Sequence, residues 1–223
     1  RAETRAWLEG NCPWSMREPM TEHDICSGGR NFVFQTGDQK LWLERMAERG
    51  WTAPTWPTSY GGGGLNQEQA KVLREEMTLI TARPPLQGMG QSMIGPALLE
   101  YGSEALKQQH LPSIARGEIR WCQGYSEPGA GSDLAGLQTR AEDNGDHFIV
   151  NGQKVWTSNA DVSDWMFCLV RTDTDAKKHE GISLVLFDMS GEGVTARPIR
   201  LISGNSIFCE TFLENVRVEK NQV

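Results

Sequence analysis

Residues 125–133 read Tyr-Ser-Glu-Pro-Gly-Ala-Gly-Ser-Asp, and this stretch decides how the rest of the chain is interpreted. It places three small residues in a row beside a hydroxyl and between two carboxylates. Glycines let a backbone approach a phosphate closely, and consecutive N–H groups in such a turn can form an anion-binding nest. Residues 151–159 read Asn-Gly-Gln-Lys-Val-Trp-Thr-Ser-Asn, which can present an aromatic face and two hydroxyls. Together the two stretches predict a site for a ligand with a phosphate and a flat ring.

The composition argues against several classes of function. The chain has 223 residues, a formal net charge of −7 and an isoelectric point near 5.2. This acidic balance argues against nucleic acids and anionic membrane surfaces as main partners. No apolar run approaches the roughly 18 residues of a membrane span, and residues 1–11 are too polar for a signal peptide. We therefore expect a cytoplasmic protein without a membrane span.

The cysteines and histidines give no sign of a metal site. The five cysteines are odd in number and scattered, with no CxxC spacing, so zinc is not expected and reduced thiols are the simplest interpretation. The histidines also lack metal-ligand spacing, and we expect them to be structural or on the surface. These residues are Cys12, Cys26, Cys122, Cys168, Cys209, His23, His110, His147 and His179.

Residues 1–119 have the pattern of helices. Thr36 or Asp38 can cap a helix that Gly50 ends, and Asn66 with Gln69 forms a capping-box pattern at the start of another. The face of this second helix is formed by Ala70, Leu73, Met77 and Ile80, which recur at spacings of three and four residues.

Two more helices and one loop are expected in this half. One short helix covers residues 96–101 and stops at Gly102. Another begins at Ser103, and Pro112 should break or kink it. Residues 51–64 are rich in proline, glycine and aromatic residues, and the glycine run 61–64 is most simply a flexible connection, with a ligand-binding role as the less favoured alternative.

From residue 120 onward the apolar period changes to two. Residues 148–157 predict a hairpin, because Asn151-Gly152 favours a type I′ turn. Further strands are expected at 165–171, 182–188, 194–198 and 207–218. Helices followed by strands, without alternation, predict an α+β fold. We expect an N-terminal all-helical domain over residues 1–119, followed by a small antiparallel β-barrel domain over residues 120–223.

Several motifs together resemble the acyl-CoA dehydrogenase family. GYSEPGAGSDLAG at 124–136 is similar to the family signature, and NGQKVWTSN at 151–159 to its second flavin-contacting stretch. WPTSYGG at 56–62 resembles the loop between two N-terminal helices, and FLENVRV at 212–218 the last barrel strand. The similarity spans nearly the whole chain in the right order. Tyr125 departs from the pattern, because the family usually has a branched aliphatic residue there.

The resemblance implies flavin adenine dinucleotide (FAD) as the cofactor. Trp156 matches the stacking tryptophan, and Ser126 and Ser158 match hydroxyls that bond the pyrimidine edge and the N5 region of the flavin. Ser132 adds a hydroxyl donor at the pyrophosphate and is also implied in binding substrate. The implied cofactor contacts are Gln123, Gly124, Tyr125, Ser126, Gly131, Ser132, Trp156, Thr157 and Ser158.

Each of these assignments has a simpler alternative. The glycine-rich segment could be only a tight turn, Trp156 a core residue of the barrel, and the serines ordinary strand residues. A nicotinamide-binding turn is excluded, because Leu134 stands where its third glycine should be. Glu127 and Asp133 invite a catalytic interpretation, but nothing in the sequence raises their pKa, so hydrogen bonding within the turn is the favoured role.

The resemblance also implies a reaction, in which an acyl-CoA is oxidised to a trans-2-enoyl-CoA. The family's base is a glutamate in a C-terminal helical domain, which would lie beyond Val223, so no catalytic residue is assigned and residues 1–223 alone should lack turnover and hold flavin poorly. Implied partners are an acyl-CoA, electron-transfer flavoprotein, and further subunits in a homotetramer or heterotetramer. The alternatives are a non-catalytic subunit of a heteromeric complex and a flavin oxidase or monooxygenase.

Overall fold

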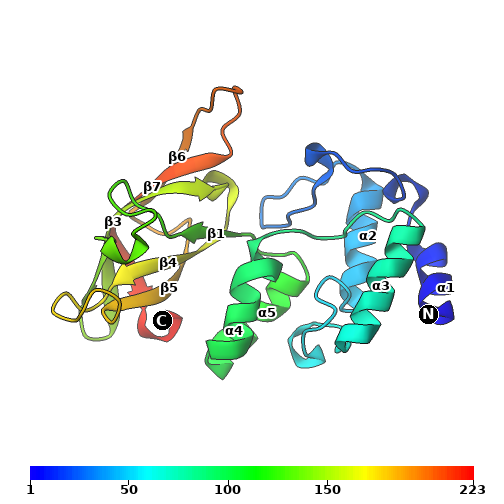
Figure 1. The fold of residues 1–223 in the computed structure, drawn as a ribbon, viewed down its shortest axis with the longest axis horizontal. Coiled ribbons are helices and arrows are strands. Elements are labelled where there is room, and N and C mark those ends of the chain that lie inside the picture. The colour runs from blue at the N-terminus through cyan, green and yellow to red at the C-terminus, as the bar shows by residue number, and fades with distance from the viewer. The chain divides into compact units, whose positions relative to one another are not determined.

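The computed structural model describes residues 1–223 in full and divides them into two compact units (Figure 1). The first covers Arg1–Ile119 and the second Arg120–Val223. The first is helical throughout, and the second is built on a sheet.

The helical unit contains five α-helices joined by short 3₁₀ turns and one π-helical turn. A π-helical turn runs directly into α4, and α5 follows after Gly102. The elements are α1 (Ala2–Asn11), η1 (Trp14–Met16), η2 (Glu22–Asp24), α2 (Gly37–Glu48), η3 (Thr58–Tyr60), α3 (Gln67–Leu79), η4 (Gly90–Ile94), α4 (Gly95–Tyr101) and α5 (Glu104–Ala115).

The expected helix ends are confirmed, with one exception. The Thr36 hydroxyl accepts a hydrogen bond from the Gln39 N–H at 3.1 Å, which caps α2. Asn66 and Gln69 form the expected reciprocal capping box of α3, each bond 2.9 Å long. Pro112 does not break α5, because the helix continues to Ala115. A proline removes one backbone donor, and here only the final turn follows it, closed by the Arg116 N–H on the Pro112 carbonyl.

The core of the helical unit lies between α1, α2 and α3. Buried members include Leu8, Trp42, Met46 and Leu73, with Met77 and Ile80 packed against them. Glu76 on the inner side of α3 is also fully buried, and it accepts hydrogen bonds from Arg5 Nε at 2.6 Å and Arg1 Nη1 at 2.7 Å. This charged contact fastens α1 to α3.

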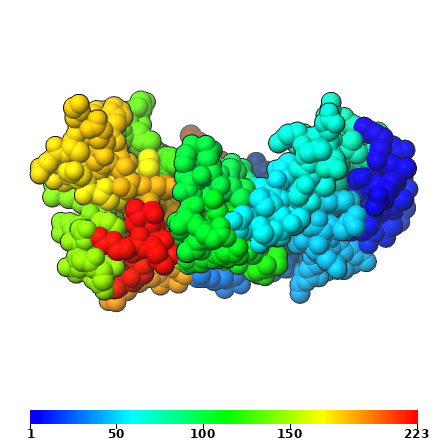
Figure 2. All heavy atoms as spheres, turned by 90° about the horizontal axis from the view of Figure 1, so that it is seen from below, coloured from blue at the N-terminus to red at the C-terminus, as the bar shows by residue number.

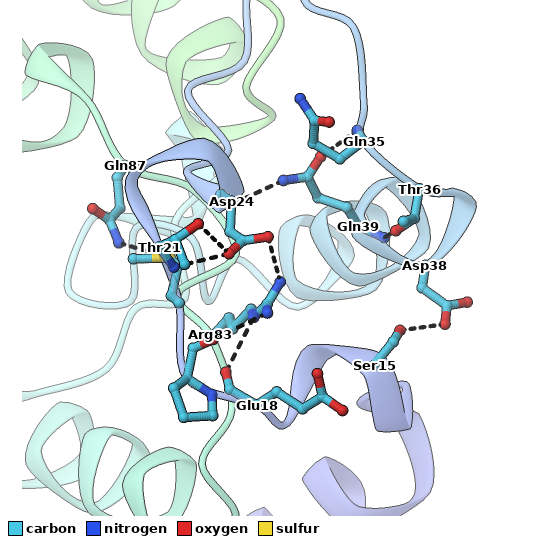
Figure 3. A network of polar contacts seen from close by, with 12 residues as sticks. Ser15, Glu18, Thr21, Asp24, Gln35, Thr36, Asp38, Gln39, Arg83 and Gln87 are labelled. Atoms are coloured by element: carbon cyan, nitrogen blue, oxygen red, sulfur yellow. Dashed lines mark hydrogen bonds and ion pairs between the residues drawn. The ribbon is translucent and has the colours of Figure 1, made fainter.

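A polar network around Arg83 holds the irregular chain between α1 and α2 (Figure 3). Arg83 pairs with Asp24 at 3.0 Å, and its guanidinium also donates to the carbonyls of Glu18 and Pro19, each at 3.1 Å. The Gln39 amide donates to the Asp24 carbonyl at 2.9 Å. One cation therefore fixes a segment that has almost no regular structure.

The glycine run at 61–64 is tightly packed, whereas a flexible connection was expected there. A Cβ placed on Gly62 would lie 2.3 Å from the Trp56 carbonyl oxygen, and one on Gly50 would lie 2.3 Å from the Gly62 carbonyl carbon. The Gly63 and Gly64 N–H groups bond to the carbonyls of Ala53 and Trp56. These glycines therefore permit close backbone contacts.

The second unit is a seven-stranded sheet in the order β1-β4-β2-β3-β7-β6, with β5 paired to the other side of β4 (Figure 1). Its strands match four of the expected ranges and add two short ones, β1 and β2, that were not expected. The strands are β1 (Trp121–Gly124), β2 (Arg140–Asp143), β3 (His147–Ser158), β4 (Trp165–Arg171), β5 (Ile182–Asp188), β6 (Val194–Ile199) and β7 (Phe208–Glu219), with short turns η5 (Leu134–Gly136), η6 (Ala160–Val162) and η7 (Lys220–Gln222).

The prediction of a small antiparallel barrel is only partly right. β1 pairs with β4 in parallel, and so does the single β2–β4 bridge, whereas the other pairs are antiparallel. The chain leaves β1, forms the β2–β3 hairpin and then returns to β4 in the direction of β1. The sheet is therefore mixed, and it curls without closing, because β5 and β6 remain as edges.

The predicted hairpin turn at Asn151-Gly152 is wrong, because β3 continues through it with only a register shift against β7 between Val150 and Gly152. The turn instead lies at Asn144-Gly145, where Gly145 has φ +89° and the Asn144 N–H bonds to the His147 carbonyl at 2.9 Å. Gly152 has a different function. A Cβ there would lie 2.4 Å from Thr139 Oγ1, so this glycine allows a close approach within the sheet.

The core of the β unit lies inside the curl of the sheet and includes Val150, Met166, Val185 and Val216. The end of the chain covers one side of the β2–β3 hairpin, where Lys220 pairs with Asp143 and lies 3.8 Å from the centre of the Phe148 ring. Figure 2 shows these last residues, in red, against the yellow-green of that hairpin. No helix in either unit has the length and apolar character needed to cross a bilayer.

Candidate functional site

The loop after β1 is closed by a single carboxylate. Glu127 Oε2 accepts the Gln138 N–H at 2.6 Å, and Oε1 accepts the Thr139 N–H at 2.9 Å. The intervening residues 128–137, which we call the glycine loop, therefore begin and end at the same side chain. Glu127 and Ala130 also exchange backbone hydrogen bonds. The role expected for Glu127, hydrogen bonding of the turn, matches these contacts.

Electrostatics keep Glu127 ionised. Burial acts to raise the pKa of this carboxyl, but hydrogen bonds from Lys154, Thr139 and Gln138 outweigh it, so the pKa lies below its usual value. A general base in a dry site needs a raised pKa. Glu127 is therefore unsuited to that task, and Asp133 at the far side of the loop is an exposed partner of Lys178.

The carbonyl groups at the far end of the glycine loop face the protein. Arg171 on β4 donates from Nη2 to the Ala135 carbonyl at 2.8 Å and from Nε to the Leu137 carbonyl at 3.3 Å. Its own N–H bonds to the Thr139 carbonyl at 2.8 Å. The guanidinium thus binds the acceptors of the loop, while Glu127 binds donors at its end.

The N–H groups of residues 131–135 are left without an acceptor inside the chain. Gly131 and Ser132 are exposed, and a Cβ added to Gly129 or Gly131 would meet nothing within 4 Å. Neither glycine is required by internal packing or by a positive φ. Free consecutive donors with open space beside them are what an anion such as a pyrophosphate needs.

The second motif is attached to the first by two contacts. Lys154 on β3 is fully buried, and its Nζ lies 2.7 Å from Glu127 Oε1 and 3.2 Å from the Tyr125 carbonyl oxygen. The next N–H along, that of Val155, donates to the Ser126 carbonyl at 2.9 Å. The structure therefore brings residues 125–127 and 154–155 side by side, as a shared site requires.

Trp156 is exposed and held in an unusual backbone conformation. Its φ is +59°, a left-handed value that is uncommon for any residue other than glycine. It lies where the β3–β7 register shifts between Lys154 and Thr157, and 56% of its surface is exposed. Phe208 on β7 supports it edge-on, with ring centroids 5.9 Å apart. Its alternative role as a core residue is therefore wrong, and its backbone strain is of a kind that clusters at functional sites.

The other expected contacts divide into accessible and buried groups. The serine hydroxyls at 126, 132 and 158 have no hydrogen-bond partner in the chain and are at least partly exposed. Gln123 and Tyr125 are half-buried, and Tyr125 packs edge-on against Phe167 with centroids 5.8 Å apart.

Gly124 and Thr157 differ from this pattern. A Cβ on Gly124 would lie 2.5 Å from Met166 Sδ, so packing in the core accounts for this glycine. The Thr157 side chain is fully buried, and its hydroxyl has no partner. Only the backbone of these two residues is left for contact with a ligand.

These features fit FAD. The free N–H row of the glycine loop suits a pyrophosphate, the exposed Trp156 face suits a flat ring, and free hydroxyls at Ser126 and Ser158 can bond to ring heteroatoms. The predicted residues from the two motifs are thus brought to one part of the β unit. No cluster of three or more His, Cys, Asp or Glu residues in either unit could hold a metal ion.

Sequence reasoning missed Lys154, Arg171 and Phe208. No local pattern indicated that Lys154 is buried, because a turn was expected between Val150 and Lys154 and the buried positions of β3 do not alternate regularly. Arg171 and Phe208 act through contacts between strands far apart in the sequence, and no local pattern indicates them.

Sequence models of a known family match both units. The N-terminal domain of the acyl-CoA dehydrogenases matches residues 30–118, and their middle domain matches residues 122–216. The chain belongs to the acyl-CoA dehydrogenase family.

Individual relatives agree with this assignment. Acyl-CoA dehydrogenase IpdE1 of Mycobacterium tuberculosis is 36% identical over 229 residues, covering 100% of this chain and 57% of the relative. FadE34 of the same organism is 43% identical over 182 residues, covering 80% of this chain and 25% of the relative. The chain therefore spans little more than half the length of IpdE1.

Solved structures show the same fold. One described as the Tcur3481-Tcur3483 steroid ACAD has a TM-score of 0.73 and 32% identity, covering 99% of this chain and 54% of its own. The ChsE4-ChsE5 complex from Mycobacterium tuberculosis has a TM-score of 0.72 and 31% identity, covering 99% and 53%. Both descriptions name assemblies of two different chains.

Proposed function

We propose that this chain is the N-terminal and middle portion of an FAD-dependent acyl-CoA dehydrogenase that oxidises an acyl-CoA to a trans-2-enoyl-CoA. The observation that carries the proposal is the strained, exposed Trp156 on a strand that is bonded directly to residues 125–127. Family membership supports it, because the same two motifs are the ones that resemble the flavin-contacting stretches.

The residues of the chain have separate tasks in this proposal. The N–H groups of the glycine loop and the Ser132 hydroxyl would hold the pyrophosphate, and Trp156 would provide the wall for the ring. Ser126 and Ser158 would orient the ring through its polar edge. FAD, when bound, supplies the hydride acceptor. The protein supplies position and keeps water from one face.

The proton-abstracting base is not assigned to these residues. Glu127 is engaged in three hydrogen bonds and its pKa is lowered, whereas removing a proton α to a thioester needs an available carboxylate of raised pKa. Asp133 is exposed on the outside of the glycine loop. We propose that the base comes from the part of the family fold that these residues do not include.

The relatives suggest where to look for a substrate and partners. The structure with 32% identity is described as a steroid ACAD, so coenzyme A thioesters of steroid fragments are the first substrates to test. The two-chain descriptions support a heterotetramer over a homotetramer. Electron-transfer flavoprotein is the proposed electron acceptor.

Flavin binding by paired tryptophan variants tests the proposal. The full-length protein and its Trp156→Ala variant would be dialysed against FAD, and the bound flavin and its absorption spectrum measured. Trp14→Ala is the matched control, because Trp14 is 80% exposed and lies in the helical unit. We expect Trp156→Ala to bind FAD at least tenfold more weakly, with a shifted spectrum, and Trp14→Ala to match the wild type. Equal binding and equal spectra in all three would contradict the site.

A further inference from the structure

We propose that Glu127 and Lys154 are positioning residues, whose buried ion pair fixes the glycine loop relative to Trp156. The proposal rests on the proposed function for the identity of the ligand and on the contacts within the chain for the coupling itself. In this proposal, one ion pair sets the position of the pyrophosphate at the glycine loop relative to the ring at Trp156.

Glu127 determines where the glycine loop ends. Glu127 immediately precedes the loop, and its carboxylate accepts the N–H groups of Gln138 and Thr139, just past the loop's last residue. The side chain is only 6% exposed, so water cannot readily replace these donors. Loss of the carboxylate would therefore free the far end of the loop.

Lys154 determines where the ring-binding end lies. The register of β3 with β7 is interrupted between Lys154 and Thr157, so Val155 and Trp156 are outside the ladder. At this point β3 is held by the Lys154 bonds to Glu127 and Tyr125 and by the Val155 N–H on Ser126. The position of Trp156 therefore depends on residues 125–127 and less on the neighbouring strand.

A second ion pair at the glycine loop does not link the loop to β3. Lys178 pairs with Asp133, but the two side chains are 50% and 69% exposed. Exposed pairs contribute little to stability. Lys178→Met is therefore a matched control for Lys154→Met, because it makes the same substitution at another lysine whose ammonium pairs with a carboxylate at the glycine loop.

Amide hydrogen exchange measured by NMR can report each substitution on the opposite side of the pair. Glu127→Gln would be assessed at the Val155 amide, and Lys154→Met at the Gln138 and Thr139 amides. We expect exchange at these amides to be at least tenfold faster than in the wild type. The rise at the β4–β5 ladder reports any general loss of stability in the same variant, and the rise at the far-side amides should exceed it at least tenfold. Lys178→Met should change exchange less than twofold at all of these amides. Such a local effect distinguishes positioning from a general loss of stability.

Two results would overturn the proposal. One is far-side exchange within twofold of the wild type, and the other is an equal rise at all amides of the β unit, including the β4–β5 ladder. If a single variant fails to fold, the Glu127→Gln/Lys154→Met double variant leaves no unpaired buried charge. It should fold and keep the tenfold faster exchange at Thr139, and wild-type exchange there would equally overturn the proposal.

An FAD titration of the same variants separates this proposal from the proposed function. We expect the Kd for FAD to rise at least tenfold in Glu127→Gln and Lys154→Met and to stay within twofold in Lys178→Met. The titration uses the full-length protein, because residues 1–223 alone are expected to hold flavin poorly. A full-length wild type that binds no FAD would contradict the proposed function, and the exchange result would still decide the positioning role. If the variants show faster amide exchange in the loop but bind FAD as tightly as the wild type, the claim that the ion pair aligns the cofactor is overturned.

Discussion

Each unit holds a segment without regular structure through one charged side chain. That side chain is a cation in the helical unit and a more deeply buried anion in the β unit. In the helical unit, Arg83 binds the carbonyls of an irregular segment and pairs with Asp24, with the two side chains 14% and 26% exposed. In the β unit, Glu127 binds N–H groups at the end of the glycine loop and pairs with Lys154, with 6% and 0% exposed. Both pairs hold chain that lacks regular structure.

The difference lies in what each pair leaves unbonded. In the segment that Arg83 holds, Gly28 is closely packed, because a Cβ on it would lie 2.3 Å from the Gly117 carbonyl oxygen. The glycine loop leaves its N–H groups at 131–135 without an acceptor in the chain. A loop that is fixed by a buried ion pair and still has free N–H groups is suited to bind a ligand.

Breaking the buried pair should have the largest effect. Lys154→Met leaves Glu127 charged in a buried place, and removing one partner of a buried pair costs roughly 3–5 kcal/mol. Arg83→Met leaves Asp24 near solvent with its bonds from Thr21, so we expect a loss of about 1–2 kcal/mol. Urea unfolding monitored by circular dichroism measures both. Equal losses would show that burial does not distinguish the two pairs.

Two glycines sharpen the comparison at a smaller scale. Gly124→Ala places a Cβ 2.5 Å from Met166 Sδ, and such overpacking costs roughly 1–3 kcal/mol. Gly131→Ala meets nothing within 4 Å, so the free energy of unfolding should change by less than about 0.5 kcal/mol. We expect Gly131→Ala to weaken FAD binding all the same. A stability loss without an effect on FAD would mean that Gly131 serves only the fold.

Acid should remove the smaller, pH-dependent part of each pair's contribution. The pKa of Glu127 is lowered in the fold, and so is that of Asp24, chiefly by hydrogen bonds from Thr21. A lowered pKa gives stability that is fully present above the unfolded value, about 4.3 for Glu and 3.9 for Asp, and that is lost as the pH falls through the folded value.

The variants Glu127→Gln and Asp24→Asn test this sign. Each should unfold with less dependence on pH below about 4.3 than the wild type does, and the two should match the wild type in slope above about pH 5.5. Unfolding in urea across this range measures the slopes. A wild-type slope in Glu127→Gln below pH 4 would show that this carboxyl titrates normally in the fold.

Local patterns predicted much of the fold. The caps at Thr36 and Asn66 are confirmed because a capping bond involves residues three apart. The Asn151-Gly152 turn failed because Asn144-Gly145 offers the same chemistry seven residues earlier, and only pairing with β7 decides between them. The parallel β1–β4 pairing is equally non-local, so the antiparallel barrel could not be corrected from the sequence.

The sequence predicted which residues form the candidate site. It did not predict the contacts that hold them in place. Motif residues such as Trp156 and Ser126 are found together on the β unit. Sequence spacing did not reveal the left-handed backbone of Trp156, because the register shift in β3 produces it. Lys154 and Arg171 were missed because their contacts join residues 27 and 36 positions apart in the chain.

The central claim is that the glycine loop and the 154–158 segment bind one FAD molecule. It is tested most directly by NMR of the isotope-labelled full-length protein titrated with FAD. We predict that the amides of residues 131–135 and the Trp156 indole N–H shift together, with one apparent Kd. Shifts at only one of these places, or a set of shifted amides that excludes both, would contradict the account.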